Sequence, residues 1–136
     1  ILSRNEAVAP RVRELTGSKG VSLVYDAVGR DTFEASLDSL SPRGLLVSFG
    51  NASGPVSGVN LGILGQKGSL YVTRPSMFHY YSDPVERTAG CARVFAMLQD
   101  GKVKVRIDQR FALADAARAH TVLEQRLTTG STVLIP

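Results

Sequence analysis

Two short apolar runs separated by a helical pattern are the feature that most constrains the fold of this chain. The first run is VSLVYD at residues 21–26 and the second is LLVSFG at residues 45–50. Continuous apolar runs of this length are typical of strands buried on both faces of a parallel sheet. Between them, Phe33, Leu37 and Leu40 have the i, i+4, i+7 spacing of one helix face. The crossover is long enough to make the strands parallel, so the pattern predicts a β-α-β unit and an α/β fold.

A third strand and an early helix complete the first part of the chain. SLYVTR at residues 69–74 alternates apolar and polar side chains, which indicates a strand with one exposed face. Pro10 limits the first helix to about residues 9–15. Asp31, with Glu34 three residues later, has the spacing of a capping box and is expected to begin the helix between the two apolar runs.

The last third of the chain has a different pattern. Asp83 followed by Pro84 predicts the start of a long helix, which Gly101 ends. The segments after it are an alternating strand, an Ala-rich helix and a closing strand, at residues 102–113, 114–126 and 131–136. This change of order indicates that the end of the chain leaves the parallel sheet.

Composition narrows the classes of function. The net charge of +4 comes from scattered Lys and Arg, without the run of five or six like charges that is typical of a nucleic-acid-binding tail. Cys91 is the single cysteine, so the sequence has no internal disulfide and no clustered zinc ligands. No apolar stretch approaches the roughly 20 residues of a membrane span. We therefore expect a cytoplasmic protein without nucleic-acid, membrane or metal partners.

Small residues follow both of the predicted parallel strands. Gly29 comes after the first, and Gly50 with Asn51 and Ser53 comes after the second. The carboxyl ends of neighbouring parallel strands meet at one edge of the sheet, where ligands bind in open α/β folds. Glycines there let a flat ligand approach main-chain N–H and C=O groups. The same glycines could only turn the chain, and the residues alone leave both interpretations open.

Other candidate motifs are weak. The G-x-G-x-x-G turn of dinucleotide-binding folds is absent, and Gly62, Gly65 and Gly68 precede a strand instead of opening a helix, so turns and close packing are their expected role. Asp26 and His79 have no partner in a catalytic pattern. We predict no catalytic residue.

A family resemblance is carried by four segments: YDAVGRDTFEASLDSL, RGLLVSFGNASGPVSGVNLGILGQKGSLYVTRPS, ADAARAH and GSTVLIP. In this order they resemble the zinc-independent quinone oxidoreductases, close to the zeta-crystallin-like members of the medium-chain dehydrogenases. The likeness covers essentially all of the chain, and FGNASG with GSLYVTRPS is its most discriminating part.

The resemblance implies an enzyme that transfers hydride from NADPH to a quinone or enone, with a Rossmann cofactor domain and a GroES-like catalytic domain. Residues 1–100 would be the C-terminal part of the NADPH-binding domain, a partial Rossmann-type parallel sheet flanked by helices. Residues 101–136 would be the strand-helix-strand that returns to the catalytic domain. The glycine-rich turn would lie upstream, so this chain is expected to be an excised piece that is inactive by itself.

The resemblance also implies cofactor contacts. Val28 matches a contact near the adenosine half, the segment 49–53 matches the main-chain grip on the nicotinamide side, residues 75–77 match a second contact segment, and Arg126 matches a basic residue that reaches the cofactor. The implied set is Val28, Phe49, Gly50, Asn51, Ala52, Ser53, Pro75, Ser76, Met77 and Arg126. Ser3 stands where related sequences carry a Tyr, so that contact is not expected to be retained.

A homodimer is also expected. The strand at residues 68–73 is an edge candidate, because no further parallel strand follows it before the long helix, and an unpaired edge invites pairing with a second copy. Two other classes remain open at this point. The piece could be a binding or dimerisation module without catalysis, or a methyltransferase-like α/β domain, which leaves FGNASG and YVTRPS unexplained.

Overall fold

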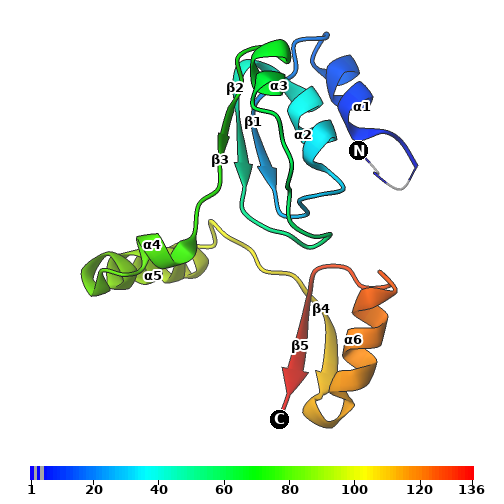
Figure 1. The fold of residues 1–136 in the computed structure, drawn as a ribbon. Helices are drawn as coiled ribbons and strands as arrows, with labels where there is room; N and C mark the ends of the chain where they lie inside the picture. Colours follow the sequence, from blue (N-terminus) through cyan, green and yellow to red (C-terminus); the bar gives the residue numbers. More distant parts are fainter. Residues whose placement is uncertain (2, 4) are drawn as a thin grey trace. The chain divides into compact units, whose positions relative to one another are not determined.

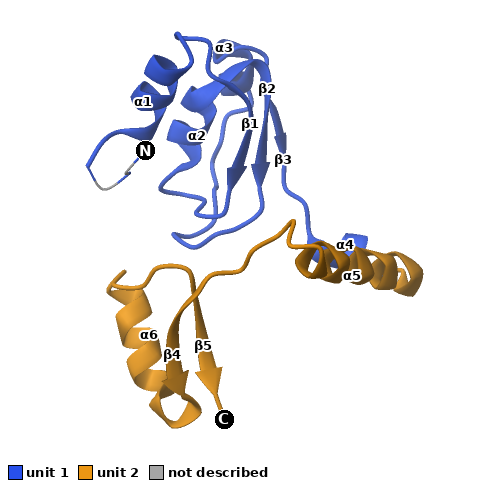
Figure 2. Cartoon of the chain, turned by 180° about the vertical axis from the view of Figure 1, so that it is seen from behind, with its two compact units in different colours: residues 1–82 blue, residues 83–136 orange. Residues whose placement is uncertain are grey.

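The computed structural model describes residues 1, 3 and 5–136, and these fall into two compact units. Unit 1 is Ile1–Ser82 and unit 2 is Asp83–Pro136 (Figure 2). The elements of unit 1 are α1 (Val8–Leu15), β1 (Val21–Asp26), α2 (Phe33–Ser39), β2 (Leu40–Ser48), α3 (Gly62–Gln66), β3 (Tyr71–Thr73) and α4 (Met77–Tyr80). The elements of unit 2 are α5 (Pro84–Gln99), β4 (Ile107–Ala112), the 3-10 turn η1 (Leu113–Asp115), α6 (Ala116–Glu124) and β5 (Ser131–Ile135).

Unit 1 is built on a parallel sheet in the order β1-β2-β3 (Figure 1). The crossover helix α2 packs on β1 and β2, which confirms the predicted β-α-β unit. The buried core joins Leu37 of α2 to Leu46 of β2 and to Leu70, and Leu64 of α3 packs against it. Burial of these branched side chains is the main favourable contribution to the stability of the unit.

Only one face of this sheet is covered within unit 1. Side chains alternate along a strand, so Val24 and Leu46 face the helices while Leu23 and Tyr25 point the other way. Leu23, Tyr25 and Tyr71 are exposed, Tyr25 by 69%. The expected burial on both faces is therefore not found for β1 in the described structure, whereas Leu45 and Val47 of β2 are half-buried on the side away from Leu46.

Several boundaries differ from the sequence prediction for local reasons. Residue Thr32 precedes α2, and Asp31 does not cap the helix but pairs with the neighbouring Arg30 at 2.9 Å. The second strand begins at Leu40, because this fully buried leucine extends β2 instead of continuing the helix face. The third strand is shorter than predicted and spans Tyr71–Thr73.

Unit 2 contains a separate parallel pair, β4 with β5, joined through η1 and α6. The prediction that the end of the chain leaves the first sheet is confirmed, since β4 and β5 form their own sheet. The predicted start of the long helix is also confirmed, because Asp83 accepts a hydrogen bond from the Val85 N–H at 2.7 Å and Pro84 is the first residue of α5.

The boundary between the two compact units falls after Ser82, so α5 is grouped with the segment that follows it. The expected division at residue 100 concerns the domains of a family and stays a prediction. In α5 the predicted apolar stripe is exposed at Val94 and Phe95. No helix in the described part of the chain combines the length and the apolar character that crossing a membrane requires.

Candidate functional site

The loops that follow β1 and β2 are bound to each other through their main chains. The carbonyl of Asp26 accepts from the N–H groups of Phe49 (2.8 Å) and Gly50 (3.3 Å). The carbonyl of Val28 accepts from both the N–H and the hydroxyl of Ser53, at 2.8 and 2.9 Å. Because Asp26 and Ser48 are in register, both loops leave the same edge of the sheet. The two strand tips, residues 26–30 and 48–54, therefore form one surface.

The glycines of these tips are required by the contact between the tips. A Cβ at Gly50 would lie 2.2 Å from the carbonyl oxygen of Ala27. Gly29 has φ of +91°, and a Cβ there would lie 2.7 Å from the carbonyl oxygen of Gly54. The space beside each glycine is filled by main chain, so a contact between the tips, which neither interpretation from the residues included, requires both glycines, and the approach of a ligand to this edge stays a prediction.

The carboxylate of Asp26 organises the first tip. It accepts hydrogen bonds from the N–H groups of Val28 and Gly29 at 2.8 and 3.0 Å, and from the hydroxyls of Thr32 and Ser36 at 2.8 and 2.7 Å. Burial raises the pKa of this carboxyl, but the hydrogen bonds from Gly29, Ser36, Thr32 and Val28 together outweigh burial and leave the pKa below its ordinary value. Asp26 is thus a charged structural anchor of the tip.

Hydrogen bonding at the second tip leaves one main-chain donor available. The N–H groups of Phe49, Gly50, Ala52 and Ser53 all donate to carbonyls of the first tip. The N–H of Asn51 donates to no acceptor in the described residues. Beside it, the ring of Phe49 is half exposed and stands edge-on to Tyr25, with 6.4 Å between ring centroids. A ligand at this edge would meet Asn51 N–H and an aromatic surface.

The structure brings some of the residues implied by the resemblance together. Val28 and the segment Phe49–Ser53 share the tip surface, and both main-chain groups of Val28 are occupied, so its half-exposed side chain is what a ligand could contact. Pro75 and Ser76 follow β3, which is in register with β2, and Met77 opens α4 with its side chain exposed. Arg126 follows α6 in unit 2, where its N–H donates to the Leu123 carbonyl.

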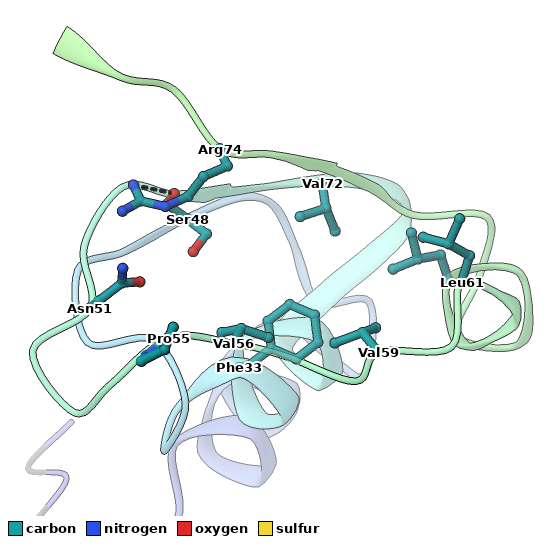
Figure 3. Close-up of a pocket in the computed structure, with 10 residues that line it drawn as sticks. Phe33, Ser48, Asn51, Pro55, Val56, Val59, Leu61, Val72 and Arg74 are labelled. Atoms are coloured by element: carbon teal, nitrogen blue, oxygen red, sulfur yellow. Dashed lines mark hydrogen bonds between the residues drawn. The ribbon is translucent and has the colours of Figure 1, made fainter. Parts of the chain in front are cut away.

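A cavity of about 340 Å³ lies in unit 1 next to the second tip (Figure 3). It is bounded by Ser48, Asn51, Arg74, Val72 and the segment 55–61, among others. Ser48 and Arg74 both lie within the segment RGLLVSFGNASGPVSGVNLGILGQKGSLYVTRPS that carries the resemblance, but neither was among the implied cofactor contacts. Sequence periodicity could not reveal this cavity, because part of its wall comes from residues 55–61, a loop without regular spacing, and the rest comes from several separate elements.

The described residues offer no metal site. Among residues 1, 3 and 5–136, no group of three His, Cys, Asp or Glu side chains could hold a metal ion. A zinc ion, which is bound by such groups, therefore has no matching set of ligands in the described chain.

Known proteins of one enzyme family are similar to this chain in sequence and in fold. The family described as "Zinc-binding dehydrogenase" matches residues 1–134. A quinone oxidoreductase of Pseudomonas aeruginosa is 61% identical over 132 residues, which cover 97% of this chain and 41% of that protein. The solved structure of a quinone oxidoreductase from Pseudomonas syringae matches this chain with a TM-score of 0.89 and 55% identity. The match covers all of this chain and 42% of the other.

A third similar protein is the Escherichia coli quinone oxidoreductase solved in complex with NADPH, with a TM-score of 0.89 and 54% identity. All of this chain and 42% of that one are covered. The fold matches the Rossmann-type domain of the quinone oxidoreductase structures. The chain belongs to the zinc-binding dehydrogenase family, and it spans about two fifths of the length of the quinone oxidoreductases it resembles.

Substitution of Gly50 tests the contact between the tips. Gly50→Ala is expected to reduce the free energy of unfolding by about 2 kcal/mol or more, because the new Cβ would overlap the Ala27 carbonyl and push the tips apart. Urea denaturation measures the loss. The matched control is Gly65→Ala in α3, where nothing lies within 4 Å and a helical alanine is neutral or stabilising by up to about 1 kcal/mol. Equal effects of the two substitutions would contradict the contact.

Asp26 predicts a dependence of stability on pH. Its folded-state pKa is lowered, so its contribution is fully present above the ordinary aspartate pKa of about 4 and is lost as the pH falls through the lowered value. Asp26→Asn is expected to cost about 2–3 kcal/mol at pH 7 and progressively less below pH ~4. Urea titrations of both proteins between these pH values measure the difference. Asp31→Asn, an exposed control, should change stability by under ~0.5 kcal/mol throughout.

Proposed function

We propose that this chain is the part of an NADPH-dependent quinone oxidoreductase that holds the nicotinamide half of the cofactor. The enzyme would transfer hydride from NADPH to a quinone or an enone without zinc. The observation that carries the proposal is the second strand tip, where the main chain is fixed by four hydrogen bonds and the Asn51 N–H alone is left to donate. The names of the similar proteins support the substrate class, and the NADPH complex of one of them supports the cofactor.

The proposed contacts follow from what each group has available. Asn51 N–H would donate to the carboxamide oxygen of nicotinamide, with Phe49 and Gly50 forming the surface beside the ring. Ala52 and Ser53 would hold that surface in place, since their N–H groups donate to the other tip. NADPH supplies the hydride when it is bound, so the residues of this chain position and shield it instead of performing acid–base chemistry.

Four further residues complete the proposed cofactor site. Val28 would contact the adenosine half through its side chain. Pro75, Ser76 and Met77 would form a second contact at the end of β3, and the exposed Met77 side chain supports this role. Arg126 would reach the cofactor from unit 2.

The proposal extends to the organisation of the protein. Residues 1–100 would belong to the cofactor domain and residues 101–136 to the catalytic domain, and the chain alone would not turn over substrate. A single cysteine and no disulfide support a cytoplasmic location. The competing proposal is a binding or dimerisation module without catalysis, which the separation of the chain into two units and the exposed face of the sheet would also allow.

A chimera tests the activity. This chain, joined to the part of the Pseudomonas aeruginosa quinone oxidoreductase that it does not match, should oxidise NADPH in the presence of a quinone, measured by the loss of absorbance of NADPH. The unjoined chain should show no turnover. Unchanged activity after treatment with a chelator is expected for a reaction without zinc. The proposal would be overturned if the chimera folded but failed to oxidise NADPH with every quinone and enone tested.

A pair of variants at Asn51 examines the main-chain contact within the same chimera. Asn51→Ala keeps the N–H and should leave the KM for NADPH within about twofold. Asn51→Pro removes the N–H and should raise this KM by about tenfold, which is the loss of roughly one hydrogen bond. If Asn51→Ala raised the KM as much as Asn51→Pro, the side chain and not the main chain would hold the cofactor.

We also propose a homodimer through residues 68–73. The strand β3 pairs with β2 on one side and, among the described residues of unit 1, with no strand on the other, and its residues Tyr71 and Val72 are exposed. An exposed strand edge offers unpaired main-chain groups to the same edge of a second copy. Two-fold pairing of this kind joins the sheets of the two subunits into one continuous sheet.

Light scattering after size-exclusion chromatography measures this association. The chain is expected to elute with twice the mass of one copy, and Tyr71→Lys should return it to a single copy, because a charged edge residue opposes strand pairing. Tyr80→Lys, at an exposed position of α4 outside the sheet, should remain dimeric. A single-copy mass for the unaltered chain at high concentration would rule out the dimer.

A further inference from the structure

The peptide unit between Ser48 and Phe49, at the end of β2, is held from both sides. The Ser48 carbonyl accepts a hydrogen bond from Nη1 of Arg74 at 3.0 Å, which Figure 3 marks with a dashed line. The N–H of Phe49, in the same peptide unit, donates to the Asp26 carbonyl at 2.8 Å. The C=O and N–H of a trans peptide point in opposite directions, so the two bonds come from opposite sides. The plane of this peptide is therefore fixed between the ends of β1 and β3.

Arg74 makes this bond at the point where regular strand pairing ends. The last paired residues of β2 and β3 are Val47 and Thr73. One residue further along each strand, the side chain of Arg74 reaches back to the carbonyl of Ser48, a residue with only 7% of its surface exposed. A side chain thus continues the contact between the two strands as far as the first residue of the second tip.

The guanidinium of Arg74 is directed to main-chain oxygens. The same Nη1 lies 3.5 Å from the Pro75 carbonyl, which is a weaker contact. No ion pair among the described residues includes Arg74, whereas Arg30 pairs with Asp31. A charged donor bonds a carbonyl more strongly than a neutral one, and it polarises the peptide so that its N–H becomes a better donor. The bond from Arg74 therefore also strengthens the contact between the two tips.

The groups proposed to meet the nicotinamide follow directly after this peptide. The Phe49 ring, 51% exposed, is attached to the next Cα, and the Asn51 N–H is two residues further along the chain. Rotation of the peptide plane would turn the ring and displace that N–H. On the other side, Arg74 directly precedes the segment 75–77. One guanidinium thus joins the two segments of unit 1, 49–53 and 75–77, that are proposed to hold the cofactor.

We propose that Arg74 is a positioning residue for the nicotinamide end of the cofactor. It holds the plane of the peptide between Ser48 and Phe49, and through this plane it sets the direction of the Phe49 ring and of the Asn51 N–H. The role towards nicotinamide rests on the proposed function, whereas the effect on the tip does not. Arg74 is not one of the cofactor contacts proposed above, because it acts through the main chain.

Hydrogen exchange in the chain itself tests the effect on the tip. Arg74→Met removes the donor but keeps a long side chain, and it should accelerate exchange of the Phe49 amide about tenfold, because the peptide then opens more readily. Exchange of the Val47 amide, inside the paired part of β2, should not change. Arg74→Lys retains a donor and should recover part of the protection.

The matched control is Arg43→Met, at an exposed position in the first half of β2. This substitution removes a guanidinium from the same strand and should leave the exchange of the Phe49 amide unaltered. If Arg74→Met also left this exchange unaltered, the proposal would be overturned.

Ligands with and without nicotinamide separate positioning from a general role in the fold. In the chimera described above, Arg74→Met should raise the Kd for NADPH about fivefold, measured by fluorescence, because the nicotinamide surface is misaligned. Arg74→Lys should raise this Kd by less. Adenosine 2′,5′-bisphosphate lacks the nicotinamide and should bind both variants as tightly as the unaltered chimera. Equal weakening of both ligands would overturn the proposal, because it would indicate a general loss of structure.

The remaining outcomes distinguish this role from its alternatives. A raised Kd for NADPH without faster exchange at Phe49 would overturn positioning in favour of a direct contact between the guanidinium and the cofactor. Equal affinity of the chimera and its Arg74→Met variant for NADPH would overturn the role towards nicotinamide. A chimera whose NADPH affinity depends on Arg74 as expected, but which reduces no quinone or enone, would support this role and contradict the proposed function alone.

Discussion

The contact between the two strand tips is the interaction on which the rest of unit 1 depends. Two parallel strands end in register, and the loop after each donates to or accepts from the main chain of the other. The buried Asp26 carboxylate fixes the first loop through four donors, and the carbonyl of the same residue fixes the second. One residue thus determines the geometry of both loops. A substitution or displacement of Asp26 would therefore shift every main-chain and side-chain group that the two loops present.

Main-chain bonding of this kind explains how a site can be rigid without many specialised side chains. Four N–H groups of the second tip already donate to the first tip, and the Asn51 N–H is the one left without an acceptor among the described residues. Rigid donors lose little entropy when a ligand binds, which favours preorganised recognition. Side chains such as Phe49 then determine the shape of the surface, while Ser48 and Arg74 line a neighbouring space with different chemistry.

The sequence predicted the parts that follow from periodicity and from helix-capping chemistry. The strand at Val21–Asp26 and the start of α5 at Asp83 were confirmed, because an apolar run and a capping aspartate act locally. The start of β2 at Leu40 and the role of Gly50 could not be predicted, since both depend on which distant atoms lie beside the residue. Asp31 was assigned wrongly because Arg30 competes for its side chain. The residues of the cofactor site came from family resemblance, and the cavity came from the structure alone.

The one-sided burial of the sheet has a thermodynamic consequence. The heat capacity change of unfolding arises mainly from apolar surface that becomes newly hydrated, and Leu23, Tyr25 and Tyr71 are already in contact with water in the folded unit. Such a unit has a shallow stability curve and responds weakly to urea, because little additional surface is released when it unfolds. Covering that face with another polypeptide would steepen both dependences and would make the folding of this half conditional on the presence of its neighbour.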